Sequence, residues 1–124
     1  MIYGIGTDLV EVSRILKSIS NGDRFKKLVF SSSEIDYCES QRNPAENFAA
    51  RFAAKEAFLK ALGTGWAGQI KFVEIEIRND DAGKPFFVLH GEAQAVFIQR
   101  KLKKVHVSLS HIKEVSMATV VIEA

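Results

Sequence analysis

The most informative segment of the chain reads Arg51-Phe-Ala-Ala-Lys-Glu-Ala-Phe-Leu-Lys-Ala-Leu-Gly-Thr-Gly65. It continues a helix that begins at Asn43-Pro44-Ala45-Glu46, where a cap residue, a proline at the first helical position and a carboxylate are typical of a helix start. Gly63 is expected to end this helix after Leu62. At 3.6 residues per turn, Glu56 interrupts the stripe that should pack against the rest of the protein. A carboxylate in that stripe needs a partner.

Two interpretations of Glu56 follow from the spacing, which leaves both open. Lys60 lies four residues further on, so the two side chains can form an ordinary helix ion pair. Alternatively, Glu56 is an oxygen ligand for a divalent cation, and Lys60 neutralises a phosphate held beside that cation. The segment Gly63-Thr64-Gly65 allows a ligand to approach the backbone closely, although its simpler role is a helix C-cap.

Asp8 is a second carboxylate in an unusual position. It stands at the end of a predicted strand, Ile2 to Leu9, on a face that otherwise carries only glycine. Asp8 and Glu11 have the spacing of a capping box for the next helix, and this use competes with metal binding. Together, Asp8 and Glu56 supply the one or two carboxylates that Mg2+ usually takes from a protein. This pairing predicts phosphoryl chemistry.

The remaining hydrophobic patterns predict an α+β protein, with an antiparallel sheet, one long helix and several short ones, in a single domain over residues 1–124. The last strand is apolar on both faces and is expected to be central. The other predicted helices cover Glu11–Ser20, Asp23–Val29, Ser31–Arg42 and Glu92–Lys103. The other predicted strands cover Ile70–Arg78, Pro85–Leu89, Val105–Ser110 and Val115–Ile122, the first two forming a hairpin around a turn at Asn79–Lys84.

Composition excludes several classes of protein. Seventeen Lys plus Arg against fifteen Asp plus Glu give a net charge of +2, far from the basic balance of a general nucleic-acid binder. The sequence shows no membrane span and no signal peptide, and its single cysteine, Cys38, agrees with a reducing compartment. We therefore expect a cytoplasmic protein that binds neither membrane nor nucleic acid.

Two further groups of residues bear on partners. Five basic residues lie between Glu11 and Phe30, where an acidic protein can dock, although a solvated helix surface is the simpler interpretation; they are Arg14, Lys17, Arg24, Lys26 and Lys27. Ser108, Ser110 and His111 lie too close together along one strand to form a catalytic triad. His111 is better interpreted as a polar group at a strand end, near a ligand.

Three segments closely resemble motifs of the holo-acyl-carrier-protein synthases, the short bacterial class of 4′-phosphopantetheinyl transferases. They are Gly4-Ile-Gly-Thr-Asp-Leu-Val-Glu-Val-Ser-Arg-Ile15, the Arg51 to Gly65 segment and Val107-Ser-Leu-Ser-His111. Their order and spacing match the family as well, and a Gly83-Lys84-Pro85 turn adds to the match. Ile112 and Met117 stand where the family often has smaller or more polar residues.

The resemblance implies a homotrimer that binds coenzyme A in clefts between neighbouring subunits, with Mg2+ on the pyrophosphate. It implies that Asp8 and Glu56 are the metal ligands and that Lys60 contacts a coenzyme A phosphate, which makes these three the catalytic residues. Arg14 matches the position that grips the acidic carrier protein. The residues implied to lie along the coenzyme A cleft are Arg51, Lys60, Gly63, Thr64, Gly65, Pro85, Ser108 and His111.

The implied reaction serves fatty acid biosynthesis. A serine hydroxyl of apo acyl carrier protein attacks the β-phosphate of coenzyme A and releases adenosine 3′,5′-bisphosphate. Metal and lysine stabilise the charge on the pyrophosphate while positioning supplies much of the remaining acceleration. Either a metal-bound water or Glu56 accepts the serine proton. Two alternatives from the residues alone are a metal-dependent phosphohydrolase and a small RNA-associated binding module that uses Lys26, Lys27 and the Arg100–Lys104 cluster.

Overall fold

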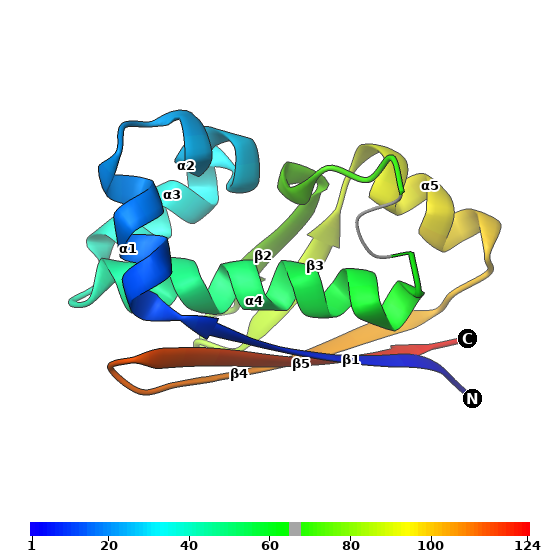
Figure 1. Cartoon of the computed structure of the whole chain (residues 1–124). Helices are drawn as coiled ribbons and strands as arrows, with labels where there is room; N and C mark the ends of the chain where they lie inside the picture. The colour runs from blue at the N-terminus through cyan, green and yellow to red at the C-terminus, as the bar shows by residue number, and fades with distance from the viewer. Residues whose placement is uncertain (65–67) are drawn as a thin grey trace.

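The computed structural model describes residues 1–64 and 68–124. The chain folds into an α+β structure, as predicted, in which a long helix lies across one face of an antiparallel sheet (Figure 1). In chain order, the elements are β1 (Ile2–Glu11), α1 (Val12–Ser20), α2 (Arg24–Val29), α3 (Ser32–Ser40), α4 (Pro44–Leu62), the 3-10 turn η2 (Phe72–Glu74), β2 (Ile75–Asn79), β3 (Pro85–Leu89), α5 (Gly91–Gln99), β4 (Lys104–His111) and β5 (Val115–Glu123).

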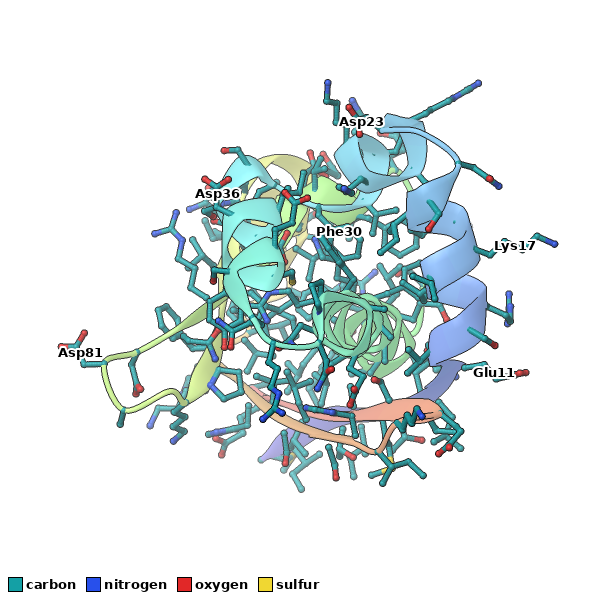
Figure 2. The ribbon with its side chains drawn as sticks, turned by 90° about the vertical axis from the view of Figure 1, so that its left-hand side faces the viewer. Glu11, Lys17, Asp23, Phe30, Asp36 and Asp81 are labelled. Atoms are coloured by element: carbon teal, nitrogen blue, oxygen red, sulfur yellow. The ribbon has the colours of Figure 1, made fainter. Side chains whose placement is uncertain are left out.

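The larger sheet has the strand order β1-β5-β4, so β5 is the central strand, as predicted. The inner face of β5 is buried under α4 and carries Ser116, Ala118, Val120 and Ile122. The outer face of the sheet carries side chains with no element packed over them in the single chain (Figure 2). Only one face of this apolar strand is therefore covered within the chain.

Two glycines determine how closely β1 lies against α4. A Cβ atom on Gly4 would collide with the backbone carbonyl oxygen of Ala61, and one on Gly6 would collide with that of Ala57. The strand and the helix therefore meet through main-chain atoms, with no side chain of β1 between them at these two positions. This contact places the end of α4 against the exposed edge of β1.

The smaller sheet is the hairpin of β2 and β3, and its turn, which includes Asp81, projects away from the body of the protein (Figure 2). The hairpin was predicted, but the start of its first strand at Ile70 was wrong. Phe72–Glu74 forms a 3-10 turn because the Glu74 carboxylate accepts a hydrogen bond from the Lys71 N–H at 2.9 Å, which closes the chain on itself there. The strand begins only at Ile75.

Other predicted boundaries also shift. β1 continues to Glu11, two residues beyond the predicted end at Leu9. α3 ends at Ser40 rather than Arg42, and α5 ends at Gln99 rather than Lys103. The end of α5 has a clear cause: Lys101 adopts a left-handed backbone conformation, with φ of 57°, which a continuing helix cannot accommodate. The predicted start and end of α4 are confirmed, although the Asn43 side chain makes no capping hydrogen bond.

The core lies between α4, the inner face of the sheet and the short helices α1 to α3. Phe30 is 2% exposed in this interior, where its ring centroid lies 4.9 Å from that of Phe48 (Figure 2). Cys38 is fully buried, and burial raises the pKa of its thiol to about 12. Within the described residues, no helix combines the length and the apolar character needed to cross a membrane.

Candidate active site

Asp8, Glu56 and Lys60 come together at the edge of the sheet where β1 meets α4. The Lys60 ammonium donates hydrogen bonds to the Asp8 carboxylate at 3.0 Å and to the Thr7 carbonyl oxygen at 2.9 Å. Because β1 is an edge strand, its backbone at Thr7 is open to this contact. An open hollow of about 490 Å³ lies beside Asp8 and Lys60 and is also lined by Leu9 and Met117. We call this set of three residues, Asp8, Glu56 and Lys60, the carboxylate group of the site, after the two carboxylates that it contains.

The two simpler interpretations of these carboxylates are wrong. Asp8 does not cap the next helix, because β1 continues past it and no side chain caps the start of α1. Lys60 pairs with Asp8 across the two elements, and the structure shows no ion pair between Lys60 and Glu56 in the described part of the chain. Asp8 and Glu56 therefore face one another without the partners that ordinary secondary structure would have given them.

The electrostatics of the carboxylate group favour a cation. Burial, followed by the negative charge of Asp8 and a hydrogen bond from protonated Glu56 to Asp8, raises the pKa of Glu56 to about 7, although Lys60 and Arg14 oppose this shift. Apart from a protonated Glu56, the buried Asp8 Oδ2 atom has no hydrogen-bond partner among the described residues. Two carboxylates that destabilise each other's charge, one with an unpaired buried oxygen, form a donor set that suits a divalent cation.

The donor set also suggests the kind of cation. Residues 1–64 and 68–124 contain no cluster of three or more histidine, cysteine, aspartate or glutamate side chains arranged to hold a metal. A site built on two oxygen ligands leaves most coordination positions to water and substrate. Mg2+ binds in this way, through one or two carboxylates together with substrate phosphates.

Arg14 lies on α1 with its side chain exposed, near enough to the carboxylate group for its charge to act on Glu56. Lys17 points outward from the same helix (Figure 2). Lys26 is partly neutralised, because it forms an ion pair with Glu39 at 3.2 Å. Of the five basic residues predicted as a docking surface, Arg14 is therefore the one whose charge reaches the carboxylate group in the described part of the chain.

A second set of predicted residues lines a groove of about 400 Å³ between α4, the hairpin turn and β4. Arg51, Pro85, Ser108 and His111 all line this groove, which we call the Arg51 groove. The His111 Nδ1 atom lies 2.9 Å from a Glu46 carboxylate oxygen, which fixes the orientation of the imidazole ring. These four residues, from three separate segments of the sequence, were predicted to lie along one cleft, and the structure brings them together. Lys60, Gly63 and Thr64, predicted for the same cleft, do not line this groove.

Sequence reasoning did not assign a site role to several other residues that line the Arg51 groove. Tyr37, Asn47 and Asn79 are among them. Their positions depend on how α3 and the hairpin pack against α4, and the sequence carries no signal for that packing. The only available hint is that Asn79 stands at a strand end before a turn, where polar residues are common for local reasons.

The helix end after Lys60 has a structural role of its own. Gly63 is the C-cap of α4, with φ of 83°, and its N–H donates to the carbonyl oxygens of Leu59 and Lys60. This confirms the simpler interpretation of that glycine. The Thr64 hydroxyl is buried and has no hydrogen-bond partner among the described residues. Gly65, the third predicted residue of this segment, lies outside the described residues.

A single chain does not bring the carboxylate group and the Arg51 groove together. Thr7, beside Asp8, pairs with Thr119 of β5, and Thr119 pairs in turn with Ser108 of β4. The carboxylate group and the Arg51 groove therefore lie at opposite edges of the three-stranded sheet.

Comparisons with known proteins show the family to which the chain belongs. The family model of the 4′-phosphopantetheinyl transferase superfamily matches residues 4–120. A holo-[acyl-carrier-protein] synthase of Cytophaga hutchinsonii is 47% identical over 122 residues, which cover 97% of this chain and 96% of the relative. The chain belongs to the holo-[acyl-carrier-protein] synthases. It is therefore an enzyme of the phosphopantetheinyl transferase class.

Solved structures of holo-[acyl-carrier-protein] synthases share the fold over their full length. The enzyme from Neisseria meningitidis superposes with a TM-score of 0.92 at 36% identity and covers 100% of both chains. The enzyme from Bacillus anthracis, solved in complex with CoA (3′,5′-ADP), has a TM-score of 0.82 at 39% identity and covers 100% of this chain and 98% of its own. Asp8, Glu56 and the polar groove thus belong to a fold that has been solved with CoA (3′,5′-ADP) in a relative.

Proposed function

We propose that this protein transfers the 4′-phosphopantetheine group of coenzyme A to a serine hydroxyl of apo acyl carrier protein, in a reaction that requires Mg2+ and serves fatty acid biosynthesis. The observation that carries the proposal is the carboxylate group. A buried, unpaired Asp8 oxygen faces a glutamate whose pKa is raised to about 7, and an exposed lysine lies beside them. The choice of coenzyme A and acyl carrier protein as substrates rests on the family to which the chain belongs.

In this proposal Asp8 and Glu56 hold the Mg2+ ion. When bound, Mg2+ supplies positive charge that stabilises the pyrophosphate and its leaving group. Lys60 is half-exposed and is held only by Asp8 and a backbone carbonyl oxygen, so its ammonium can turn to an incoming phosphate at little cost. Arg14 attracts the acidic carrier protein to the edge of the same site.

The bonds that change are at the β-phosphorus of coenzyme A. The serine hydroxyl gives its proton to Glu56 or to water, and its oxygen forms a new bond to this phosphorus. The bond to the bridging pyrophosphate oxygen breaks, and adenosine 3′,5′-bisphosphate leaves. Holding the serine in line with the leaving oxygen supplies much of the acceleration, because phosphoryl transfer depends on positioning and charge stabilisation.

Intact-mass spectrometry tests this reaction directly. Purified apo acyl carrier protein incubated with the enzyme, coenzyme A and Mg2+ should gain the mass of one phosphopantetheine group. Asp8→Ala and Glu56→Ala should each abolish the gain. Release of products from coenzyme A without any change in the carrier protein would instead indicate a phosphohydrolase. Absence of coenzyme A binding would contradict the proposed function altogether.

We also propose that the enzyme is a homotrimer whose active sites lie between subunits. Support comes from the outer face of the larger sheet, which exposes large apolar side chains that a monomer would leave in water, namely Ile5, Leu9 and Met117. A cyclic assembly through this face also offers a way to bring the carboxylate group of one subunit to the Arg51 groove of the next.

A mixing experiment tests this assembly. Glu56→Gln and Arg51→Met subunits, each inactive alone, are co-expressed with different tags, and the mixed species are purified. If each site uses both subunits, every mixed trimer holds one intact site, so activity returns to about a third of the wild-type level. Sites contained within one chain would give no recovery. Light scattering should report a trimer for the wild type and a smaller species for Leu9→Glu.

A further inference from the structure

Arg51 is an unusual residue because it is a buried cation whose nearest carboxylate, that of Glu34, is shared with a second buried cation, Lys55. The residue is 2% exposed, yet it lines both the Arg51 groove and a second hollow of about 400 Å³ beneath the hairpin. Buried guanidinium groups in proteins are normally paired with a carboxylate. The arrangement around Arg51 therefore requires an explanation.

Glu34 is the nearest carboxylate, but other groups already use it. Its oxygens accept hydrogen bonds from the Lys55 ammonium at 2.7 Å, the Ser31 N–H at 2.9 Å and the Ile77 N–H at 3.1 Å. The Arg51 Nε atom lies 4.0 Å from this carboxylate, beyond hydrogen-bond distance, and has no hydrogen-bond partner in the described part of the chain. Lys55 thus balances the charge of Glu34, and the charge of Arg51 remains available.

Neutral groups hold Arg51 instead. The guanidinium carbon lies 4.2 Å from the centroid of the Tyr37 ring, so the ring and the cation are in direct contact. Arg51 Nη2 donates to the Asn79 side-chain oxygen at 2.7 Å, and the Asn79 amide donates in turn to the Gly83 carbonyl oxygen at 3.0 Å. Asn79 therefore links Arg51 to the hairpin turn that forms one wall of the groove.

We propose that Tyr37 and Asn79 are positioning residues that fix the Arg51 guanidinium in the groove, where it binds an anionic group of coenzyme A. The inference rests on the proposed function and adds the two residues that prepare the cation. A ring and an amide orient Arg51 without neutralising it, so its charge is available to the ligand before the ligand arrives. Preorganisation of this kind lowers the ordering cost of binding.

The test separates binding of coenzyme A from chemistry. Tyr37→Leu removes the ring, and we expect the KM and Kd for coenzyme A to rise about tenfold, while kcat stays within about twofold at saturating coenzyme A. Tyr37→Phe keeps the ring and should restore affinity relative to Tyr37→Leu. Asn79 is half-buried at the end of β2 and lies outside α3. Asn79→Ala therefore tests the same idea without disturbing that helix, and it should also raise the KM for coenzyme A.

A double-mutant cycle and a matched control complete the experiment. In an Arg51→Met background, Tyr37→Leu should change the Kd for coenzyme A by less than about twofold, because the ring acts through Arg51. Phe86→Leu removes an exposed aromatic ring from the same hairpin and should leave the KM for coenzyme A unchanged.

Three outcomes would overturn the inference: a Tyr37→Leu variant with wild-type KM, a Tyr37→Phe variant as impaired as Tyr37→Leu, or an effect that persists in full without Arg51. The wild-type enzyme serves as the reference for the proposed function. Suppose that the wild-type enzyme modifies the carrier protein, but the effects of Tyr37→Leu and Arg51→Met on the Kd for coenzyme A simply add. Then only the positioning role is wrong. If the wild-type enzyme neither binds coenzyme A nor modifies the carrier protein, the proposed function and this inference are both wrong.

Discussion

The carboxylate group and the Glu34–Lys55 pair both bring opposite charges from different elements together. They differ in how completely their polar atoms find hydrogen-bond partners. Lys55 is fully buried and donates three hydrogen bonds, to Glu34 and to the carbonyl oxygens of Val29 and Phe72. Asp8, by contrast, faces Glu56, and apart from a protonated Glu56 its buried Oδ2 atom meets no hydrogen-bond donor in residues 1–64 and 68–124. The hydrogen bonds of the first arrangement are made within the described residues, whereas the second leaves a carboxylate oxygen open to a ligand.

This difference separates stability from function. Groups whose hydrogen bonds are all made inside the chain hold the structure together, and removing one leaves the other unpaired in the interior. Groups that the fold leaves unpaired weaken the folded state slightly and prepare it for a ligand. Substitutions in the two regions should therefore affect different measurements.

The largest expected effect is on stability, from Lys55→Met. This change leaves the buried Glu34 charge without its partner, and we expect the free energy of unfolding to fall by about 3 to 5 kcal/mol. Urea unfolding followed by circular dichroism measures it. Adding Glu34→Gln should recover part of the loss, because the uncompensated charge is then gone. Lys60→Met, which removes an exposed partner, should cost less than about 1 kcal/mol. Equal losses at the two lysines would contradict the comparison.

Glu56→Gln should show the opposite pattern. Transfer to the carrier protein should fall about 100-fold or more at saturating Mg2+, because one of two cation ligands loses its charge. The melting temperature without Mg2+ should stay the same or rise, since the repulsion between Glu56 and Asp8 is removed. Activity comes from steady-state transfer assays and stability from thermal unfolding of the same preparation. Full turnover in this variant would exclude Glu56 from both metal binding and proton transfer.

Arg14→Glu should act on the protein substrate alone. We expect the KM for apo acyl carrier protein to rise about tenfold, with the Kd for coenzyme A unchanged, because this arginine attracts an acidic surface. The defect should grow smaller as salt is added. Lys101→Glu, near the end of α5, is the matched control and should have no effect on either substrate. A parallel loss of coenzyme A affinity would show that the substitution damages a shared site.

The last expected effect is the pH dependence of the free energy of unfolding at Glu76. Burial alone would raise the pKa of this carboxylate, but hydrogen bonds from Ser31, Ser33 and His90 outweigh burial and lower it to about 2. Because its pKa is lowered in the folded state, Glu76 stabilises the fold when the pH is above the ordinary pKa of a glutamate, near 4.5. This stabilisation is lost as the pH falls toward about 2. Glu76→Gln should therefore be less stable than the wild type at pH 7, with a gap that narrows on acidification. Urea unfolding at several pH values measures this gap, and a constant gap would contradict it.

Local sequence patterns predicted most of the fold. The boundaries of α4, the hairpin and the central place of β5 follow from periodicity, a proline at a helix start and a long apolar strand. The errors fall where a single hydrogen bond or backbone angle decides the conformation, as at Glu74 before β2 and at Lys101 after α5. Periodicity does not detect interactions of that kind.

The candidate site divides along similar lines. Asp8 and Glu56 were identifiable because each carboxylate occupies a position where its neighbours predict packing. Tyr37 and Asn79 were not, because an aromatic residue on a helix and an asparagine before a turn are ordinary in a sequence. Their importance depends on Arg51, which lies 28 residues from Asn79 along the chain and touches it only after folding.

The direct contact of β1 with α4 at Gly4 and Gly6 also bears on how this protein can change over evolutionary time. Because Asp8 lies on that strand and Glu56 on that helix, main-chain contacts rather than interlocking side chains set the spacing of the two carboxylates. Substitutions that alter the volume of the surrounding core can accumulate without moving them relative to one another. The chain can therefore diverge widely in its interior while keeping the geometry of its chemistry constant.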